Sequence, residues 1–354
     1  MTTGGPSYAA AGVDIAAADR AVDLMRAAVA AAARPEVVGG IGGFAGLFDA
    51  SKLAAYRRPL LATSTDGVGT KVMIAQRLGQ YDTIGIDLVA MVADDLVVCG
   101  AEPLFMTDYL VFGKVIPQRV ATIVSGIAAG CLQAGCALVG GETAEHPGHL
   151  GAADFDIAGA ATGVVEADEL LGPDRVRAGD AVIAMASSGL HANGFSLVRD
   201  ILARTGMDLA DEPPELSGTL GAELCTPSRI YTPACLALSR ASRVHAFAHI
   251  TGGGIAANMT RVLPAGCDAV IDRRTWCPPP VFRLLARHGG MPGGMAGEAM
   301  ERVFNLGVGM TAVVPPDETA AALDLLGRHG VQAWLAGEIV PGSGAARLTG
   351  SYAA

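Results

Sequence analysis

The sequence has little of several residue types that mark specialised proteins. Only 5% of its 354 residues are aromatic, and its seven cysteines are an odd number with no CxxC pair. This cysteine pattern predicts neither a zinc site nor a disulfide framework, and it favours reduced, buried thiols in a cytoplasmic protein. Residues 1–6 lack the basic and apolar regions of a signal peptide. The apolar stretch 123–141 is rich in Ala and Gly, so we interpret it as a buried helix followed by a strand, not as a membrane span.

Positive charge is also scarce. With 25 Lys and Arg against 35 Asp and Glu, the chain has a formal net charge of -10. A negative protein repels polyanions, so we expect neither nucleic acid nor an anionic membrane as a partner, although a local site can still bind a small anion. In contrast, 51% of the residues are apolar and 47 are glycine. This composition predicts about two domains with close helix packing and loops whose backbone meets a ligand, as in a phosphate-handling enzyme.

Predicted strands and helices alternate along the chain, which favours an α/β fold. The patterns predict helices at 16–33, 72–78, 84–98 and 123–134, and strands at 59–65, 105–112, 136–139, 157–165 and 181–186. A turn at Gly172-Pro173-Asp174 separates two halves that both combine strands, glycine-rich loops and helices. We therefore predict one domain at 1–171 and a second at 172–354.

The first segment with chemical potential follows the strand predicted at 59–65. Asp66, Gly67, Gly69, Thr70 and Lys71 place a carboxylate, two glycines, a hydroxyl and an ammonium within six residues. Backbone N–H groups, Thr70 and Lys71 can meet phosphate oxygens there, while Asp66 can hold a hard cation. The spacing is not that of a Walker loop, and the alternative is an ordinary turn with an aspartate cap.

Acidic side chains mark two further places. Asp87, Asp94 and Asp95 interrupt an apolar helix, where charges are costly unless they are paired or bound to a metal such as Mg²⁺. Glu142 follows a predicted strand, at the kind of strand end where α/β proteins often place site residues. The alternatives are a structural ion pair in the helix and a solvated loop acid at Glu142.

Two glycine-rich stretches match a dinucleotide fingerprint in form only. Gly40, Gly42 and Ala45 fit G-x-G-x-x-A, as do Gly252, Gly254 and Ala257, but the first lacks a clear preceding strand. We expect the loop with Gly42 and Gly43 to be a flexible lid over phosphates, and a plain flexible loop is the alternative.

Two loops each bring a histidine beside glycines. The first contains Ser188, Gly189, His191 and Asn193, and the second runs from His249 through Thr251, Gly252 and Gly253. A histidine can donate, accept or shuttle a proton near pH 7. A lone histidine is usually structural, but two in matched contexts favour function.

The motifs occur in a specific order along nearly the whole chain. They are AGVDI at 11–15, RPE at 34–36, GGIGGF at 39–44, TDGVGTK at 65–71, GAEP at 100–103, GGETAEHPG at 140–148, SSGLHANGFSLVR at 187–199, HITGGG at 249–254 and FNLGVGM at 304–310. Together they resemble the phosphoribosylformylglycinamidine cyclo-ligase (AIR synthetase) family. The resemblance implies an ATP-dependent ring closure in purine biosynthesis, which converts formylglycinamidine ribonucleotide (FGAM) into aminoimidazole ribonucleotide (AIR), ADP and phosphate.

The resemblance also implies a fold, partners and residue roles. The N-terminal strands of two copies would pair into a β-barrel across a homodimer, with a C-terminal α/β domain beside it and ATP between the domains near the dimer interface. Transient contact with neighbouring purine-pathway enzymes is a further expectation. The implied ATP-site residues are Gly42, Gly43, Asp66, Gly67, Gly69, Thr70, Lys71, Asp94, Asp95 and Glu142. The implied Mg²⁺ ligands are Asp66, Asp95 and Glu142. The implied substrate-binding residues are Ser188, Gly189, His191, Asn193, Thr251, Gly252 and Gly253. The catalytic candidates are His191, His249 and Lys71, with His191 preferred for proton transfer.

Some positions depart from the family pattern. Ala9 and Ala10 replace a lysine and an acid, Asp94 stands where asparagine is frequent, and Ala299 replaces an acid. Three competing interpretations are another ATP-using enzyme of the same superfamily, an NAD-dependent dehydrogenase and a non-catalytic assembly protein. The two histidine loops argue against the first, the strand contexts against the second, and the polar loops against the third.

Overall fold

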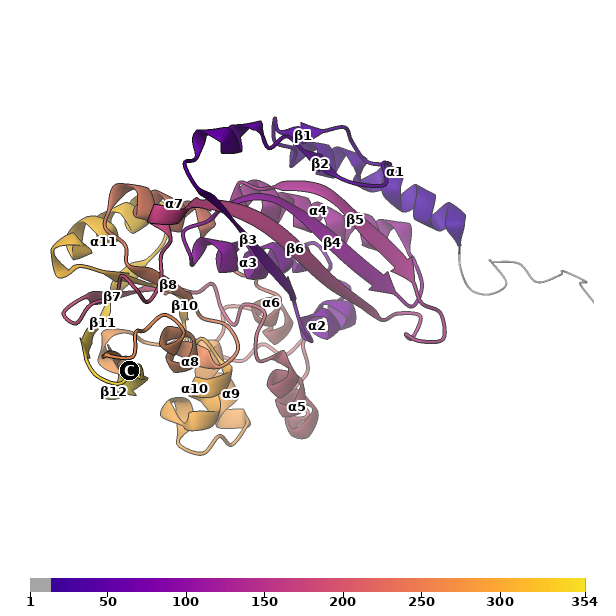
Figure 1. Cartoon of the computed structure of the whole chain (residues 1–354). Coiled ribbons are helices and arrows are strands. Elements are labelled where there is room, and N and C mark those ends of the chain that lie inside the picture. The colour runs from indigo at the N-terminus through magenta and orange to yellow at the C-terminus, as the bar shows by residue number, and fades with distance from the viewer. Residues whose placement is uncertain (1–13, 354) are drawn as a thin grey trace, which may run out of the picture.

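The computed structural model describes residues 14–353, which form two domains side by side (Figure 1). Each domain is built on one main sheet with helices, as the α/β prediction requires. Ala9 and Ala10 lie outside the described residues. All seven cysteines are free thiols. Within residues 14–353, no helix combines the length and the apolar character needed to cross a membrane.

The N-terminal domain holds a four-stranded sheet in the order β3-β6-β4-β5, in which only β4 and β5 run parallel. Its strands are β1 (Val37–Val38), β2 (Leu47–Phe48), β3 (Pro59–Gly67), β4 (Glu102–Phe112), β5 (Ala137–Glu145) and β6 (Phe155–Glu166). Its α-helices are α1 (Ile15–Ala31), α2 (Lys71–Leu78), α3 (Ile84–Val97) and α4 (Pro117–Ala134). The small ribbon β1–β2 flanks the glycine-rich loop.

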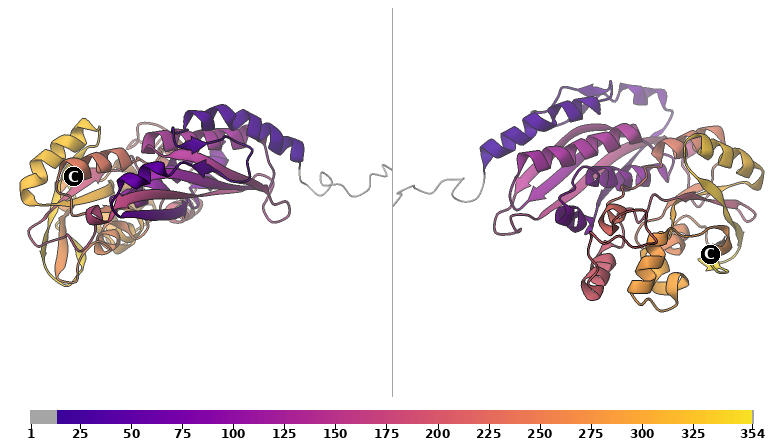
Figure 2. Two further views of the ribbon diagram at one scale, coloured as in Figure 1. Left: turned by 45° about the horizontal axis from the view of Figure 1, so that its top comes forward. Right: turned by 180° about the vertical axis from the view of Figure 1, so that it is seen from behind.

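Helices α3 and α4 cover one face of this sheet, and α1 packs on α4 (Figure 2). Gly85 lets α3 approach α4 closely, because a Cβ there would lie 2.3 Å from the Ile127 nitrogen. The apolar side chains Met106, Leu110 and Phe112 of β4 point into the core beneath the helices. The close helix packing expected from the glycine content is therefore confirmed between α3 and α4.

The other face of the curled sheet is uncovered by any helix of the described chain (Figure 1). Leu61 of β3 and Tyr109 of β4 alternate with core-facing neighbours, and their side chains are 65% and 41% exposed. These two large side chains lie on the same face of the sheet and are open to solvent in the single chain. The curled sheet, open on this face, has the form of half a barrel (Figure 1).

The C-terminal domain holds a six-stranded sheet in the order β12-β9-β11-β7-β10-β8. Its strands are β7 (Ala181–Ala186), β8 (Ala246–His249), β9 (Cys267–Asp272), β10 (Val308–Val314), β11 (Ala333–Pro341) and β12 (Ala346–Thr349). Its α-helices are α5 (Phe195–Thr205), α6 (Leu220–Leu224), α7 (Thr232–Ala241), α8 (Gly254–Thr260), α9 (Pro280–His288), α10 (Glu298–Val303) and α11 (Thr319–Arg328). Strand β10 is buried along its whole length, since it lies between β7 and β8 with helices on both faces.

Three predicted boundaries need correction. Helix α4 begins at Pro117, not at residue 123, because proline suits the first turn of a helix. Strand β5 continues to Glu145 through pairing with β4, so Glu142 lies within the strand and does not follow its end. Asp66 likewise lies within β3, paired with Gly159, and does not belong to a loop.

Candidate active site

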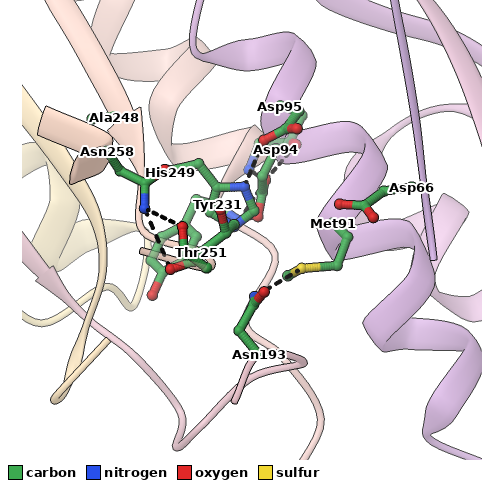
Figure 3. Close-up of polar contacts among 12 residues, drawn as sticks. Asp66, Met91, Asp94, Asp95, Asn193, Tyr231, Ala248, His249, Thr251 and Asn258 are labelled. Carbon is green, nitrogen blue, oxygen red and sulfur yellow. Dashed lines mark hydrogen bonds and ion pairs between the residues drawn. The ribbon is translucent and has the colours of Figure 1, made fainter. Parts of the chain in front are cut away.

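Side chains from both domains meet beside α3 (Figure 3). The group comprises Asp66 from β3, Asp95 from α3, Asn193 from the turn before α5, His249 from the end of β8, and Thr251 from the turn before α8. These residues come from five elements that are distant in sequence, and they face one region. The structure therefore brings together two of the three predicted Mg²⁺ ligands, Asp66 and Asp95, and one of the two histidine candidates.

The closest link in this group joins the domains. The Nδ1 atom of His249 lies 2.9 Å from Oδ1 of Asp95. The His249 side chain is 2% exposed and that of Asp95 is 34% exposed. Because Asp95 accepts the hydrogen on Nδ1, the buried Nε2 atom is a proton acceptor, and it has no partner in the described part of the chain. This geometry is that of a base oriented by a carboxylate.

Asp66 is the second acid of the group. Its carboxylate accepts a hydrogen bond from the Gly67 N–H at 2.7 Å. Partial burial raises the pKa of Asp66, and the neighbouring Asp95 raises this pKa further. Two adjacent carboxylates without a cation between them repel each other, so a bound Mg²⁺ would relieve that repulsion with the hard oxygen ligands it prefers.

His191 is built differently from His249. It is 1% exposed, has a φ of 62°, and accepts a hydrogen bond at Nε2 from the Ser188 N–H at 3.2 Å. Its hydrogen is therefore on Nδ1, and this buried donor has no partner within residues 14–353. Burial holds the pKa of His191 well below its usual range, so the ring stays neutral. The two histidines thus offer one free acceptor and one free donor.

The loops around the histidines are held by buried asparagines. Asn258 of α8 donates to the carbonyls of Thr251, Gly252 and Gly254 at 2.9 to 3.3 Å. Asn305 donates to the carbonyl of Gly189 at 3.0 Å. Each loop therefore has a fixed backbone, and Gly253 adopts a φ of 98° that favours glycine.

The predicted phosphate-binding segment lies next to the first histidine loop. The Thr70 hydroxyl is 3.1 Å from that of Ser196, and Gly69 has a φ of 55°. A Cβ on Gly69 would lie 3.9 Å from the Ala192 carbonyl, so this turn borders the His191–Asn193 loop. Gly67, Gly69 and Thr70 are therefore at the same end of the sheet as Asp66.

Three predicted residues lie at the other edge of the sheet. Asp66 pairs with Gly159 of β6, Gly159 with Asp108 of β4, and Asp108 with Gly141 of β5. Glu142 is therefore about 14 Å from Asp66 across three strand spacings. Gly42 and Gly43 belong to the loop that passes β5, where a Cβ on Gly46 would lie 2.4 Å from the Val139 carbonyl. Among the described residues no group of three or more His, Cys, Asp and Glu side chains can hold a metal ion.

Two other predicted ATP-site residues are buried between the domains. Lys71 donates to Asp87 at 2.8 Å and to the Thr226 carbonyl at 2.7 Å, and it is 1% exposed. Asp94 is fully buried and accepts hydrogen bonds from Tyr231 and Thr232. Neither side chain faces Asp66. The alternative of a structural ion pair in the acidic helix is thus realised at Asp87.

Comparison with known proteins gives the family. Models of AIR synthase related proteins match the chain at residues 49–165 (N-terminal domain) and 177–348 (C-terminal domain). The chain is also 45% identical over 350 residues to the phosphoribosylformylglycinamidine cyclo-ligase of Geobacillus kaustophilus, covering 98% of this chain and 99% of that protein. This chain belongs to the phosphoribosylformylglycinamidine cyclo-ligase family.

The cyclo-ligase fold extends to more distant proteins. Thiamine-monophosphate kinase from Stenotrophomonas maltophilia is 20% identical with a TM-score of 0.66, covering 94% of this chain and 97% of that one. A hydrogenase maturation protein, HypE in complex with ATP, is 18% identical with a TM-score of 0.60, covering 94% of this chain and 90% of that one. At these identities the likeness is one of fold alone.

Sequence reasoning missed several residues that hold this group of side chains in place. The backbone N–H groups of Tyr231 and Thr232 donate hydrogen bonds to Asp94 of α3 across the domain interface. Asn258 holds the Thr251 loop by a hydrogen bond to the Thr251 carbonyl. Asn258 has a local signal, since it lies one helical turn after the glycines whose carbonyls it binds. Tyr231 and Thr232 have none, because their contacts are made across more than 130 residues of sequence.

A cavity of about 780 Å³ also lies between the domains, beside the start of β8. Two arginines of its lining already have acidic partners, since Arg240 pairs with Glu102 and Arg243 pairs with Asp317. None of the predicted site residues lines it. This cavity is therefore separate from the group around Asp95 and His249, which lies at the other end of β8.

Proposed function

We propose that this protein catalyses the ATP-dependent cyclisation of FGAM to AIR, with release of ADP and phosphate. The observation that carries this proposal is the 45% identity to a cyclo-ligase over 98% of the chain. The geometry around Asp95 and His249 supports the roles proposed below for individual residues.

The reaction needs an activated leaving group, because an amide oxygen leaves poorly. We propose that the formyl amide oxygen attacks the γ-phosphorus of ATP, so that ADP leaves. The amidine nitrogen then attacks the formyl carbon, the carbon–oxygen bond breaks, and phosphate departs with the former amide oxygen. One proton must leave the attacking nitrogen for the ring to become neutral.

His249 is suited to accept this proton. Its Nε2 atom is free, and Asp95 aligns the ring and stabilises the charge that follows protonation. His191 is suited to the opposite task, since its free Nδ1–H can donate a hydrogen bond to the activated oxygen. The geometry thus favours His249 over His191 for proton removal.

Asp66 and Asp95 are the proposed Mg²⁺ ligands within one chain. When bound, the ion neutralises charge on the transferring phosphoryl group. The backbone N–H groups of Gly67 and Gly69 and the Thr70 hydroxyl lie beside this acid pair and would contact the phosphate oxygens of ATP. Ser188, Gly189, Asn193, Thr251, Gly252 and Gly253 form the proposed substrate surface.

A second copy of the chain would complete the site. Gly42, Gly43 and Glu142 lie at the sheet edge remote from Asp66, and the uncovered sheet face carries Leu61 and Tyr109. We propose that two such half-barrels close face to face into one barrel, which brings Glu142 of each chain toward the acids of the other. We also propose that the boundary between the two domains lies at residues 171/172. Transient contacts with neighbouring purine-pathway enzymes are a further part of the proposal.

The test is an assay of the purified protein with Mg²⁺-ATP, with and without FGAM. We expect ADP release that depends on FGAM and that is matched mole for mole by AIR. ATP binding without either product would contradict the proposal and indicate a related enzyme with a different acceptor.

A further inference from the structure

Two adjacent aspartates at the end of α3 contact the other domain in different ways. Asp95 binds the His249 ring directly. Asp94, the preceding residue, binds the segment that begins α7. Figure 3 shows both carboxylates leaving α3 toward the C-terminal domain.

Asp94 holds this segment by four hydrogen bonds. The Tyr231 N–H lies 3.0 Å from both carboxylate oxygens, and the N–H and hydroxyl of Thr232 each lie 2.8 Å from Oδ1. All donors are within the first turn of α7 or just before it, so Asp94 acts as a cap supplied by the other domain. Such a buried, charged acceptor fixes the backbone at Tyr231.

Tyr231 passes this constraint to His191. The Tyr231 hydroxyl donates to the Ala186 carbonyl at 2.8 Å, and its ring centroid lies 6.1 Å from that of His191. Gly309 packs against both rings, because a Cβ there would lie 2.1 Å from the Tyr231 hydroxyl and 2.5 Å from Cε1 of His191. The rings of His191 and Tyr231 are therefore packed closely against the same backbone position, so a shift of Tyr231 changes the surroundings of His191.

We infer that Asp94 is a positioning residue, which acts through Tyr231 to hold the Nδ1–H of His191 in place. Asp94 and Asp95 would thus align one histidine each, the donor and the acceptor of the reaction. This inference rests on the proposed function for its kinetic consequence, but not for the geometry of His191.

The matched control is Asp87, the other fully buried aspartate of α3. It also accepts hydrogen bonds from the second domain, namely from the Ser228 N–H and hydroxyl at 2.8 and 2.6 Å. Its partners are Lys71 and Ser228, and it makes no contact with Tyr231 or His191. Loss of either aspartate removes a buried carboxylate between the domains. Asp94 is linked to His191 by the packed Tyr231 ring, whereas Asp87 is linked to it only indirectly, through the charge of Lys71 and the Ser188–Pro227 contact.

The experiment combines Asp94→Ala and Asp87→Ala with His191→Asn, since asparagine tolerates the positive φ at position 191. We expect Asp94→Ala to lower kcat by about tenfold or more with little change in the KM for ATP. It should have no further effect in the His191→Asn background. Asp94→Asn, which keeps one acceptor oxygen, should restore most of kcat. Asp87→Ala should act additively with His191→Asn.

A second measurement does not depend on turnover. The ring ¹⁵N shifts of His191 should change in Asp94→Ala. They should change less in Asp87→Ala, which leaves Lys71 without its ion-pair partner but does not disturb the packing of Tyr231. If Asp94→Ala does not fold, Thr232→Val removes one donor to Asp94 and should shift the same signals. Additive kinetics with unchanged His191 shifts would overturn the inference. An absence of AIR formation by the wild type, with the shifts as expected, would overturn only the proposed function.

Discussion

His249 of one domain is aligned by Asp95 of the other, through a 2.9 Å contact between Nδ1 and the carboxylate. A base and its orienting acid are usually held by neighbouring elements, but here they depend on how two domains pack. If His249 is the base, as proposed, catalysis depends on the domain interface to which Asp87 and Asp94 also contribute hydrogen bonds.

The two histidines should respond differently to substitution. Removing the proton acceptor with His249→Gln should lower kcat by about 100-fold or more, as expected for loss of a general base. His191→Asn should lower kcat by less, because a hydrogen-bond donor remains. Steady-state assays of AIR formation measure both effects. An equal or larger loss for His191→Asn would reverse the assignment.

Asp66→Asn should weaken the use of Mg²⁺. The variant loses one negative charge beside Asp95, so the Mg²⁺ concentration giving half-maximal rate should rise by about tenfold. A titration of activity with Mg²⁺ at saturating ATP measures this change. Asp156→Asn, on the same sheet but outside the site, is the control and should leave the titration unchanged.

Mixed dimers test whether the site is shared. At limiting Mg²⁺, chains with Asp66→Asn and chains with Glu142→Gln should each have little activity alone. If Glu142 serves the other chain, mixing them restores one intact site in each mixed dimer, and activity should return to about one quarter of the wild type. Leu61→Arg should give monomers in size-exclusion chromatography. No recovery in verified mixed dimers would place Glu142 outside the shared site.

The buried ion pair of Lys71 and Asp87 should matter for stability. Lys71→Met leaves a fully buried carboxylate without its cation, and this loss should cost about 3–5 kcal/mol in the free energy of unfolding. Urea unfolding monitored by circular dichroism measures the difference. Lys71→Met combined with Asp87→Leu should recover part of the loss. A cost below about 1 kcal/mol would contradict a structural role.

Asp108 should make stability fall with rising pH. Burial raises the pKa of Asp108 to about 7, above the unfolded value of about 4, so the folded state binds this proton more tightly. The stabilisation is complete below about pH 4 and is lost as pH rises to about 7. Asp108→Asn should therefore exceed the wild type in Tm by about 3 °C or more at pH 8, with a smaller gain at pH 5. An equal difference at both pH values would contradict this pKa.

Sequence patterns were sufficient to predict the main helices and strands and to find the motifs nearest the proposed site of reaction. The helix α3 and the strand before Asp66 were predicted nearly to the residue, and the functional role of the two histidine loops stays a prediction. These features are local, since each depends on residues a few positions apart. The strand status of Asp66 and Glu142 was missed, because pairing with β6 and β4 extends strands through polar residues.

The roles of Lys71 and Asp94 could not be predicted from the sequence. Both lie next to residues of the site, and charged side chains there suggest ligand binding. Their partners, Asp87 and Tyr231, are distant in sequence and come into contact only in the folded protein. The neighbouring sequence does not distinguish an aspartate that caps a buried helix from one that binds a metal ion. The division of Asp66 and Glu142 between two sheet edges is likewise a property of strand order.

The contacts that Asp87 and Asp94 make with the second domain are mostly to backbone N–H groups, at residues 228, 231 and 232. Most side chains of this segment can therefore change during evolution without loss of the contact. Its length cannot change, because one inserted or deleted residue between 228 and 231 would move one N–H donor out of reach. We expect relatives of this protein to vary in composition here while keeping the number of residues constant.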